Sequence, residues 1–169
     1  MKNQILGAAL VAIAVLVPNV SLSAPKANTQ QQLLAANAQF YAALNTMFTG
    51  EFSPMSEIWS HRADVIQMGP FGGRLVGWSA VGAEFKKVAA MKLGGRVVPK
   101  DVLVVSGDGN LGYTVCVEEG EHMSAGGRQI TVKHRATNIF RRENGAWKLA
   151  EHHTDISTDL QKSDGAPVH

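Results

Sequence analysis

The fold of this chain is decided by residues 140–149, which read Phe-Arg-Arg-Glu-Asn-Gly-Ala-Trp-Lys-Leu. The tight turn Glu-Asn-Gly separates two strand-like runs, 128–142 and 146–156. Asn-Gly between two such runs is the strongest local signal for a β-hairpin. Two more strand-like runs, 96–105 and 111–122, precede it and are bounded by turn-forming residues. The C-terminal half therefore predicts an antiparallel meander of three or four long strands.

Upstream of the meander the pattern changes to helical spacing. Apolar residues recur every three or four positions over 30–48 and again over 78–91, which predicts two amphipathic helices. A short helix is expected to start at Ser53, and a short strand is expected over 64–68. Helices followed by an antiparallel meander indicate the α+β class. Helices cover only one face of such a sheet, so we expect the other face to be covered in a homodimer.

Composition is typical of one globular domain. The 169 residues are 45% hydrophobic and 18% charged, and the net charge is +2. Lys and Arg are scattered rather than gathered in a stripe, which argues against a nucleic-acid-binding protein. Cys116 is the only cysteine, which excludes an internal disulfide and a cysteine-cluster metal site.

The N-terminus has the pattern of an export signal. Lys2 precedes an unbroken apolar run, 5–17, and Ser21 and Ser23 are the small residues expected before a cut after Ser23. The run is shorter than the roughly 20 residues that span a membrane. We therefore expect an exported protein, periplasmic or secreted, with no membrane association after cleavage.

This interpretation divides the chain into four parts. They are a signal peptide over 1–23, a flexible lead over 24–29, one folded domain over 30–156 and a polar C-terminal tail over 157–169.

The order of elements and several motifs resemble the nuclear transport factor 2-like superfamily, which includes SnoaL-like domains and ketosteroid isomerase. The motifs are the 140–149 hairpin followed by His153, Trp59 followed by 65–69, and Gly77-Trp78 before the third helix. The resemblance implies a cone-shaped, strongly bent antiparallel sheet with three N-terminal helices packed on its concave face. It leaves function open, because this fold hosts isomerases, cyclases, dehydratases, hydrolases and assembly domains.

The chain departs from the isomerases of this family. The stretch that matches the position of their general base, 67–70, has no carboxylate. The position of their oxyanion-hole acid falls near Thr137 or Asn138, which are not acids. Steroid isomerisation by that set of residues is therefore not expected.

The last strand carries the candidate catalytic residues. Strict alternation places Trp147, Leu149, Glu151, His153 and Asp155 on one face. If that face is the concave one, His153 is a candidate general base, with Asp155 or Glu151 orienting it at the mouth of a pocket. The alternative is that the strand leaves the core there and these side chains are solvated.

The preceding strand-like run carries three arginines to consider. Arg135 could bind a carboxylate of a ligand, or could pair with Glu151 or Asp155 on the neighbouring strand. Arg141 and Arg142, near the turn, are expected in solvent.

No metal or other cofactor is expected. His152 and His153 are adjacent in a strand, so they point to opposite faces and cannot share an ion without a β-bulge.

The leading hypothesis is an exported protein that binds a small organic ligand in a mainly apolar pocket. One alternative is a cofactor-independent isomerase, dehydratase or cyclase with His153 as its base, and another is a structural dimerisation domain without a cavity. Each candidate for the pocket wall could instead be ordinary core. The candidates are Trp59, Met68, Phe71, Trp78, Tyr113, Arg135, Thr137 and Tyr41.

Overall fold

Three helices form the N-terminal half, as predicted. The computed structural model describes residues 28–70, 73–106 and 109–156. Its helices are α1 (Thr29–Met47), α2 (Ser53–Ile58) and α3 (Trp78–Met91). Asn28 and Thr29, which the sequence analysis assigned to the flexible lead, instead form the start of α1. Asn28 Oδ1 accepts a hydrogen bond from the Gln31 backbone N–H, and the Asn28 N–H donates to Gln31 Oε1, so the helix begins with a capping box.

Six strands form one sheet in the order β2-β1-β8-β7-β4-β3, and two short strands form a separate hairpin. The bounds are β1 (Ile66–Met68), β2 (Leu75–Val76), β3 (Arg96–Ser106), β4 (Leu111–Glu121), β5 (Ser124–Ala125), β6 (Arg128–Gln129), β7 (Lys133–Glu143) and β8 (Ala146–Ile156). The long strands β3, β4, β7 and β8 are antiparallel, as predicted. The expectation of a wholly antiparallel sheet is wrong in one place, because β1 pairs with β8 in parallel.

The hairpin that decides the fold forms as its sequence indicates. Asn144 and Gly145 both have positive φ, 50° and 83°. This is the backbone that a two-residue hairpin turn needs, and Asn-Gly adopts it at low cost.

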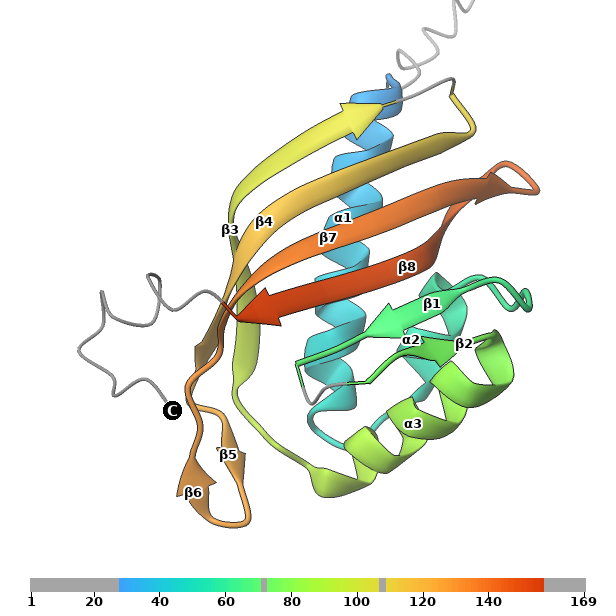
Figure 1. Cartoon of the computed structure of the whole chain (residues 1–169). Coiled ribbons are helices and arrows are strands. Elements are labelled where there is room, and N and C mark those ends of the chain that lie inside the picture. Colours follow the sequence, from blue (N-terminus) through green and yellow to red (C-terminus); the bar gives the residue numbers. More distant parts are fainter. Residues whose placement is uncertain (1–27, 71–72, 107–108, 157–169) are drawn as a thin grey trace, which may run out of the picture.

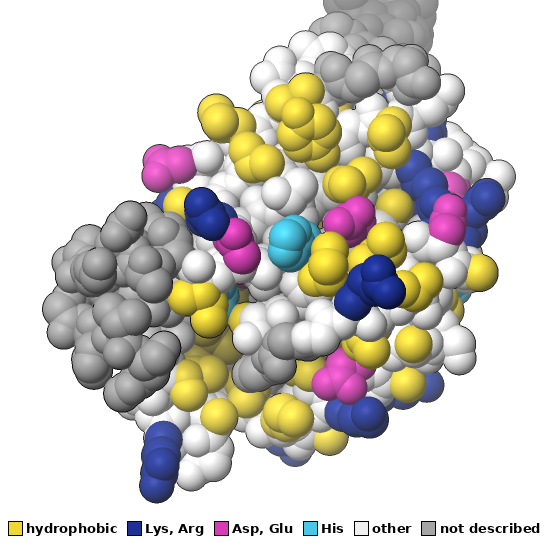
Figure 2. Space-filling model, viewed as in Figure 1, with side chains coloured by type: hydrophobic (Ala, Val, Ile, Leu, Met, Phe, Trp, Pro, Cys, Tyr) yellow, Lys and Arg dark blue, Asp and Glu magenta, His cyan; other side chains and the backbone are white. Residues whose placement is uncertain are grey.

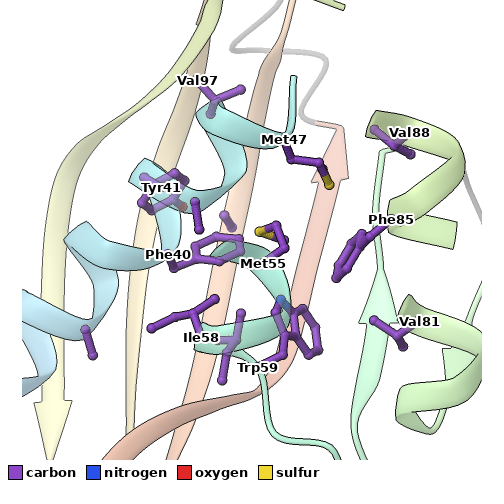
Figure 3. Packing of buried hydrophobic residues seen from close by; sticks show 14 of the residues in the cluster. Phe40, Tyr41, Met47, Met55, Ile58, Trp59, Val81, Phe85, Val88 and Val97 are labelled. Atoms are coloured by element: carbon purple, nitrogen blue, oxygen red, sulfur yellow. The ribbon is translucent and has the colours of Figure 1, made fainter. Parts of the chain in front are cut away.

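The helices cover one face of the curved sheet. Figure 1 shows α1 crossing behind the long strands, with α2 and α3 beside the β1–β2 edge. The core lies between these layers, and Figure 3 shows side chains from all three helices meeting there. Phe40, Met55 and Trp59 from the helical half are no more than 1% exposed, and so are Phe140 and Leu149 from the sheet. The α+β cone with three helices on its concave face is therefore confirmed.

A β-bulge in β8 overturns the predicted alternation of that strand. Phe140 pairs with Leu149 and Ile139 pairs with Glu151, so Ala150 is an extra residue without a partner position. Beyond the bulge the inward positions shift by one. Trp147 and Leu149 are buried as predicted, but His152 is then buried and His153 is exposed.

Some sequence-based expectations lie outside the described residues. These are the signal peptide, the lead as far as residue 27, the side chain of Phe71 and the tail over 157–169. Within the described ranges, no helix has the length and apolar character needed to cross a membrane.

Candidate functional site

A cavity of about 270 Å³ lies between the helices and the β1–β8 edge of the sheet. Apolar side chains from α1, α2 and α3 form most of its wall, and Figure 3 shows Phe40, Met55 and Phe85 among them. These apolar residues are Phe40, Leu44, Met47, Met55, Phe85 and Val88. The space is thus in the concave half of the fold, where the sequence analysis expected a pocket.

Two polar side chains from neighbouring strands enter the same wall. Gln67 of β1 and His152 of β8 are partner positions in the parallel ladder, and both line the cavity. Partner residues in a parallel pair project to the same face of the sheet. His152 is 4% exposed, and the Oε1 atom of Gln67 is buried without a hydrogen-bond partner. Glu84 of α3, which is half-buried and pairs with Lys87, is the acidic member of the lining.

A buried hydrogen-bond network of two asparagines and one threonine holds the ring of His152. Its Nδ1 atom lies 2.6 Å from Asn138 Oδ1 on β7. Asn138 Nδ2 donates to Asn37 Oδ1 on α1 at 2.9 Å, and Thr114 Oγ1 of β4 donates to the same oxygen at 2.7 Å. All four residues are buried, so the ring of His152 is held by hydrogen bonds that reach from the sheet to the helix.

The buried acid Glu118 lies beside this hydrogen-bond network. Glu118 of β4 is 4% exposed, and burial raises its pKa to about 7, against a smaller lowering by its hydrogen bond with Tyr41. The Tyr41 hydroxyl donates to Glu118 Oε1 at 2.9 Å and lies 3.1 Å from Cys116 Sγ. Burial also raises the pKa of Cys116, to about 11, so its sulfur stays a thiol near neutral pH.

His152 is held neutral by the same burial. Desolvation, with smaller contributions from the charges of His153 and His134, lowers the pKa of His152 to about 3. Its Nε2 atom is 3.9 Å from Glu118 Oε1. Burial therefore disfavours the charged form of both groups: His152 is neutral near pH 7, and Glu118 keeps its proton below about pH 7.

The predicted catalytic residues lie on the opposite face of the sheet. His153, Asp155, Arg135 and Thr137 line a shallow hollow of about 420 Å³ on the face that the helices leave bare. The predicted pairing of Arg135 with Asp155 is confirmed at 2.5 Å between Nη2 and Oδ2. The expectation that Glu151, His153 and Asp155 face the helices is wrong, because the bulge at Ala150 turns this part of β8 outward. Arg135 and Thr137 face outward because they alternate with the buried Ala136 and Asn138 along β7.

The predicted pocket-wall residues are scattered. Tyr41 is buried on the inner face, but its hydroxyl group already donates a hydrogen bond to Glu118. Trp59 packs against Phe85, a lining residue, with ring centroids 5.3 Å apart. Trp78 stacks on His61 at 4.3 Å, away from the described lining. Tyr113 is 40% exposed on the outer face, so its predicted place in the core is wrong.

Met68 also falls outside the described lining. It pairs with His153 at the end of β1, one position after Gln67.

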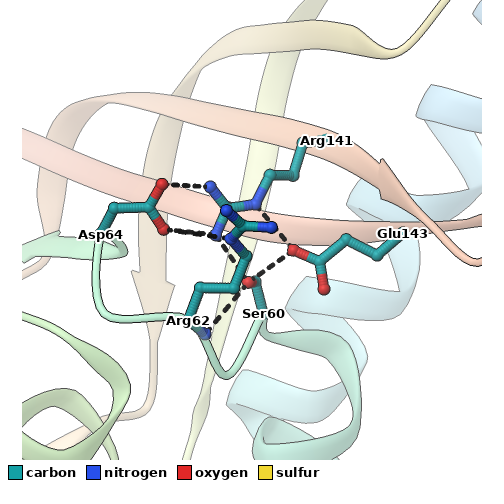
Figure 4. A network of polar contacts seen from close by, with 5 residues as sticks. All are labelled: Ser60, Arg62, Asp64, Arg141 and Glu143. Carbon is teal, nitrogen blue, oxygen red and sulfur yellow. Dashed lines mark hydrogen bonds and ion pairs between the residues drawn. The ribbon is translucent and has the colours of Figure 1, made fainter.

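Arg141 is not in solvent as expected, but joins the sheet to the chain before β1. Figure 4 shows its guanidinium between two carboxylates. It donates to both Asp64 oxygens at 2.8 and 2.7 Å, to Glu143 at 2.7 Å and to Ser60 at 2.7 Å. This network fixes the segment that leads from α2 into β1, and so helps to position Gln67.

Four polar residues in the cavity wall or behind it were not predicted as site residues: Gln67, Glu118, Asn138 and His152. Asn138 shares a face with Phe140, a buried aromatic, and that alternation could have placed it inside. The position of His152 depends on the bulge, for which the sequence carries no local signal. Among the described residues, no cluster of His, Cys, Asp and Glu has the geometry of a metal site.

Comparison with known proteins identifies the family. The sequence profile of the SnoaL-like domain matches residues 33–157. The chain belongs to the SnoaL-like domain family. Among curated proteins, no relative matches the chain.

Solved structures with the same fold are numerous. One, a member of the NTF2-like family from Streptomyces avermitilis provisionally named a dehydratase, is 25% identical, with a TM-score of 0.63 over 77% of this chain and 97% of that one. A protein from Thiobacillus denitrificans, provisionally named a calcium/calmodulin-dependent protein kinase type II association domain, is 24% identical, with a TM-score of 0.59 over 72% and 91%.

A third, from Shewanella frigidimarina and provisionally named a ketosteroid isomerase, is 14% identical, with a TM-score of 0.59 over 75% and 97%. At these identities the second and third structures share the fold of the SnoaL-like chain and nothing finer.

Proposed function

We propose that this SnoaL-like protein binds a small, mainly apolar organic molecule in the cavity between its helices and the β1–β8 edge. The observation that carries the proposal is a hollow of about 270 Å³ with apolar walls and two adjacent polar groups, Gln67 and His152. Few polar groups placed in an apolar cavity are typical of small-molecule sites. A purely structural domain would have filled this space with side chains.

Binding is favoured over proton-transfer catalysis by the state of the histidine. A side chain whose pKa is lowered to about 3 is a weak proton acceptor at neutral pH. His153, the base expected from the sequence, is on the far side of the sheet from this cavity. The residues that reach the cavity therefore support recognition of a ligand better than removal of a proton.

A substitution that fills the cavity with a larger side chain tests the proposal. Val88 lines it from α3 and is 7% exposed, whereas Val76 is a 52% exposed valine of β2 outside the described lining. Calorimetric titration with naphthalene and 2-naphthol should show binding to the wild type and to Val76→Phe, and loss of binding to Val88→Phe. A wild type that binds neither probe at its solubility limit would refute the proposal.

We also propose that the protein acts as a homodimer through the outer face of its sheet. Four apolar side chains on the strands of that face are 40% to 65% exposed: Leu103, Val105, Leu111 and Tyr113. Figure 2 looks onto this face, and yellow side chains gather toward its upper end. Contiguous exposed apolar surface of this kind marks an interaction site. The relative from T. denitrificans is itself named an association domain.

Export is proposed from the sequence alone. The N-terminus has the pattern of a signal peptide: a positive residue, a 13-residue apolar run and small residues before Ala24. N-terminal sequencing of the protein recovered from its native cells should give Ala24 as the first residue. Recovery of the uncut chain from the cytoplasm would contradict the proposal.

A further inference from the structure

We infer that the ligand of this cavity presents hydroxyl hydrogens to the wall formed by β1 and β8, so that a neutral alcohol or phenol is selected over a ketone or an ether. The inference rests on the proposed function, because it concerns the ligand of the same cavity. It follows from the hydrogen-bond roles that the buried amides leave to His152 and Gln67.

The proton on His152 is placed by its neighbours. Asn37 Oδ1 accepts hydrogen bonds from Thr114 Oγ1 and from Asn138 Nδ2. The amide nitrogen of Asn138 is therefore turned toward Asn37, which leaves Asn138 Oδ1 facing His152 Nδ1 at 2.6 Å. An amide oxygen only accepts, so Nδ1 is the atom that carries the hydrogen.

The other ring nitrogen is then a free acceptor. In a neutral imidazole with its proton on Nδ1, Nε2 carries a lone pair. Glu118 Oε1 lies 3.9 Å from His152 Nε2, beyond hydrogen-bond distance. Within the described part of the chain Nε2 has no hydrogen-bond partner, and His152 lines the cavity. A donor for Nε2 must come from whatever occupies the space.

Gln67 also has an acceptor without a hydrogen-bond donor. Its Oε1 atom is buried without a partner, and it stands at the partner position of His152 on the neighbouring strand. A carbonyl or ether oxygen placed against His152 Nε2 or Gln67 Oε1 would set lone pair against lone pair. A hydroxyl group would instead donate the hydrogen bond that each of these acceptors lacks.

The charges of the lining residues also restrict the charge of the ligand. The described lining has no Lys or Arg, and it includes the carboxylate of Glu84. A carboxylate ligand would find no cation and one repelling acid, so the occupant is expected to be neutral. The indole Nε1 of Trp59 is also without a partner, but Trp59 is not part of the described lining, so this donor does not change the preference.

Matched probes test the inference. Calorimetry on the full chain compares naphthalene, 2-naphthol, 2-methoxynaphthalene and 2-acetylnaphthalene, which share one ring system. We expect 2-naphthol to bind at least about tenfold more tightly than the ether and the ketone, as one added hydrogen bond allows. Gln67→Met should reduce that ratio. The matched change at an exposed glutamine of β6, Gln129→Met, should leave it unaltered.

The outcomes separate the two proposals. If naphthalene binds but the ether or ketone binds as tightly as the alcohol, the inference about hydroxyl groups is wrong and the proposed function stands. If none of the four probes binds, the proposed function itself falls.

A second measurement does not depend on any probe. Nitrogen-15 NMR of the free protein should show His152 as a neutral ring protonated on Nδ1, with the signal assigned by its loss in His152→Gln. A proton found on Nε2 instead would overturn the inference, because Nε2 would then be a donor to the cavity.

Discussion

The hydroxyl group of Tyr41 on α1 donates a 2.9 Å hydrogen bond to the carboxyl group of Glu118 on β4, inside the core. Both side chains are under 5% exposed. The bond ties the long helix to the centre of the sheet, and it places an acid where its ionised form is poorly solvated. Burial raises the pKa of Glu118 to about 7, so the folded protein keeps a proton that the unfolded chain releases near pH 4.5.

This proton makes stability depend on pH, and Glu118→Gln tests it. Between pH 4.5 and about 7 the unfolded state is ionised and the folded state is not, so Glu118 destabilises the fold increasingly as pH rises. The variant keeps an acceptor for Tyr41 without the charge. Urea denaturation should show equal stability at pH 4.5 and a variant more stable above pH 7, by on the order of 3 kcal/mol. A difference that does not vary with pH would contradict the assignment.

The same series should reveal His152. Folding lowers the pKa of His152 from 6.5 in the unfolded chain to about 3. The stability of the folded state therefore falls as pH drops from 6.5 toward 3, because only the unfolded chain binds the proton there. In the wild type the opposing slopes of Glu118 and His152 cancel between pH 4.5 and 6.5. With Glu118→Gln the cancellation is removed, so stability should rise with pH through that window, and His134, whose pKa burial also lowers, adds a slope of the same sign.

Close packing of α1 on β4 predicts the effect of Gly112→Ala. A methyl group at this position would lie 2.5 Å from Leu33 Cδ1 and 3.2 Å from the Val105 carbonyl oxygen. Leu33 is fully buried, so it cannot turn away into solvent. We expect a loss of about 1–3 kcal/mol in unfolding free energy. The loss should shrink in a Leu33→Ala background, where the methyl group has room, and strict additivity of the two changes would argue against this contact.

The outer face of the sheet predicts the oligomeric state. Leu103→Lys puts a charge into the exposed apolar surface, and should convert the proposed dimer to a monomer in analytical ultracentrifugation. Met91→Lys, at a 58% exposed methionine at the end of α3, should leave the mass unchanged. A wild type that sediments as a monomer, or a dimer insensitive to Leu103→Lys, would rule out this interface.

The guanidinium network predicts a difference between Arg and Lys at position 141. Arg141→Lys keeps the charge but cannot bind Asp64 with two parallel hydrogen bonds while also contacting Glu143 and Ser60. Because Asp64 is exposed, we expect only about 1 kcal/mol of destabilisation. Arg128→Lys, at an exposed arginine of β6, should have no measurable effect in the same denaturation experiment. Equal effects would mean that the network adds nothing to stability.

Local signals in the sequence were enough for the fold. The Asn144-Gly145 turn, the helical spacing before residue 91 and the turn clusters act over short distances, so they can be read without a structure. The parallel pairing of β1 with β8 could not be predicted this way, because the partners are far apart in the chain and β1 has only three residues.

The site was harder for two physical reasons. The extra residue at Ala150 shifts the inward positions, so His152 enters the core in place of His153. In β4 the more apolar face, with Tyr113 and Val115, is the outer one, and the face with Thr114 and Glu118 packs under α1. Apolar content alone therefore pointed to the wrong side of this strand, because the inner side satisfies its polar groups with hydrogen bonds.

The β1–β8 pair also constrains how the protein is made. Gln67 leaves the ribosome long before His152, yet the two belong to one wall. Contacts between distant parts of a chain form slowly, because a large loop must first close. A nascent chain that ends before β8 has its three helices and β1, but it lacks the strand that brings His152 to the cavity wall. The wall can be completed only when synthesis is almost over, so truncation near the C-terminus should disrupt the cavity more than the few missing residues suggest.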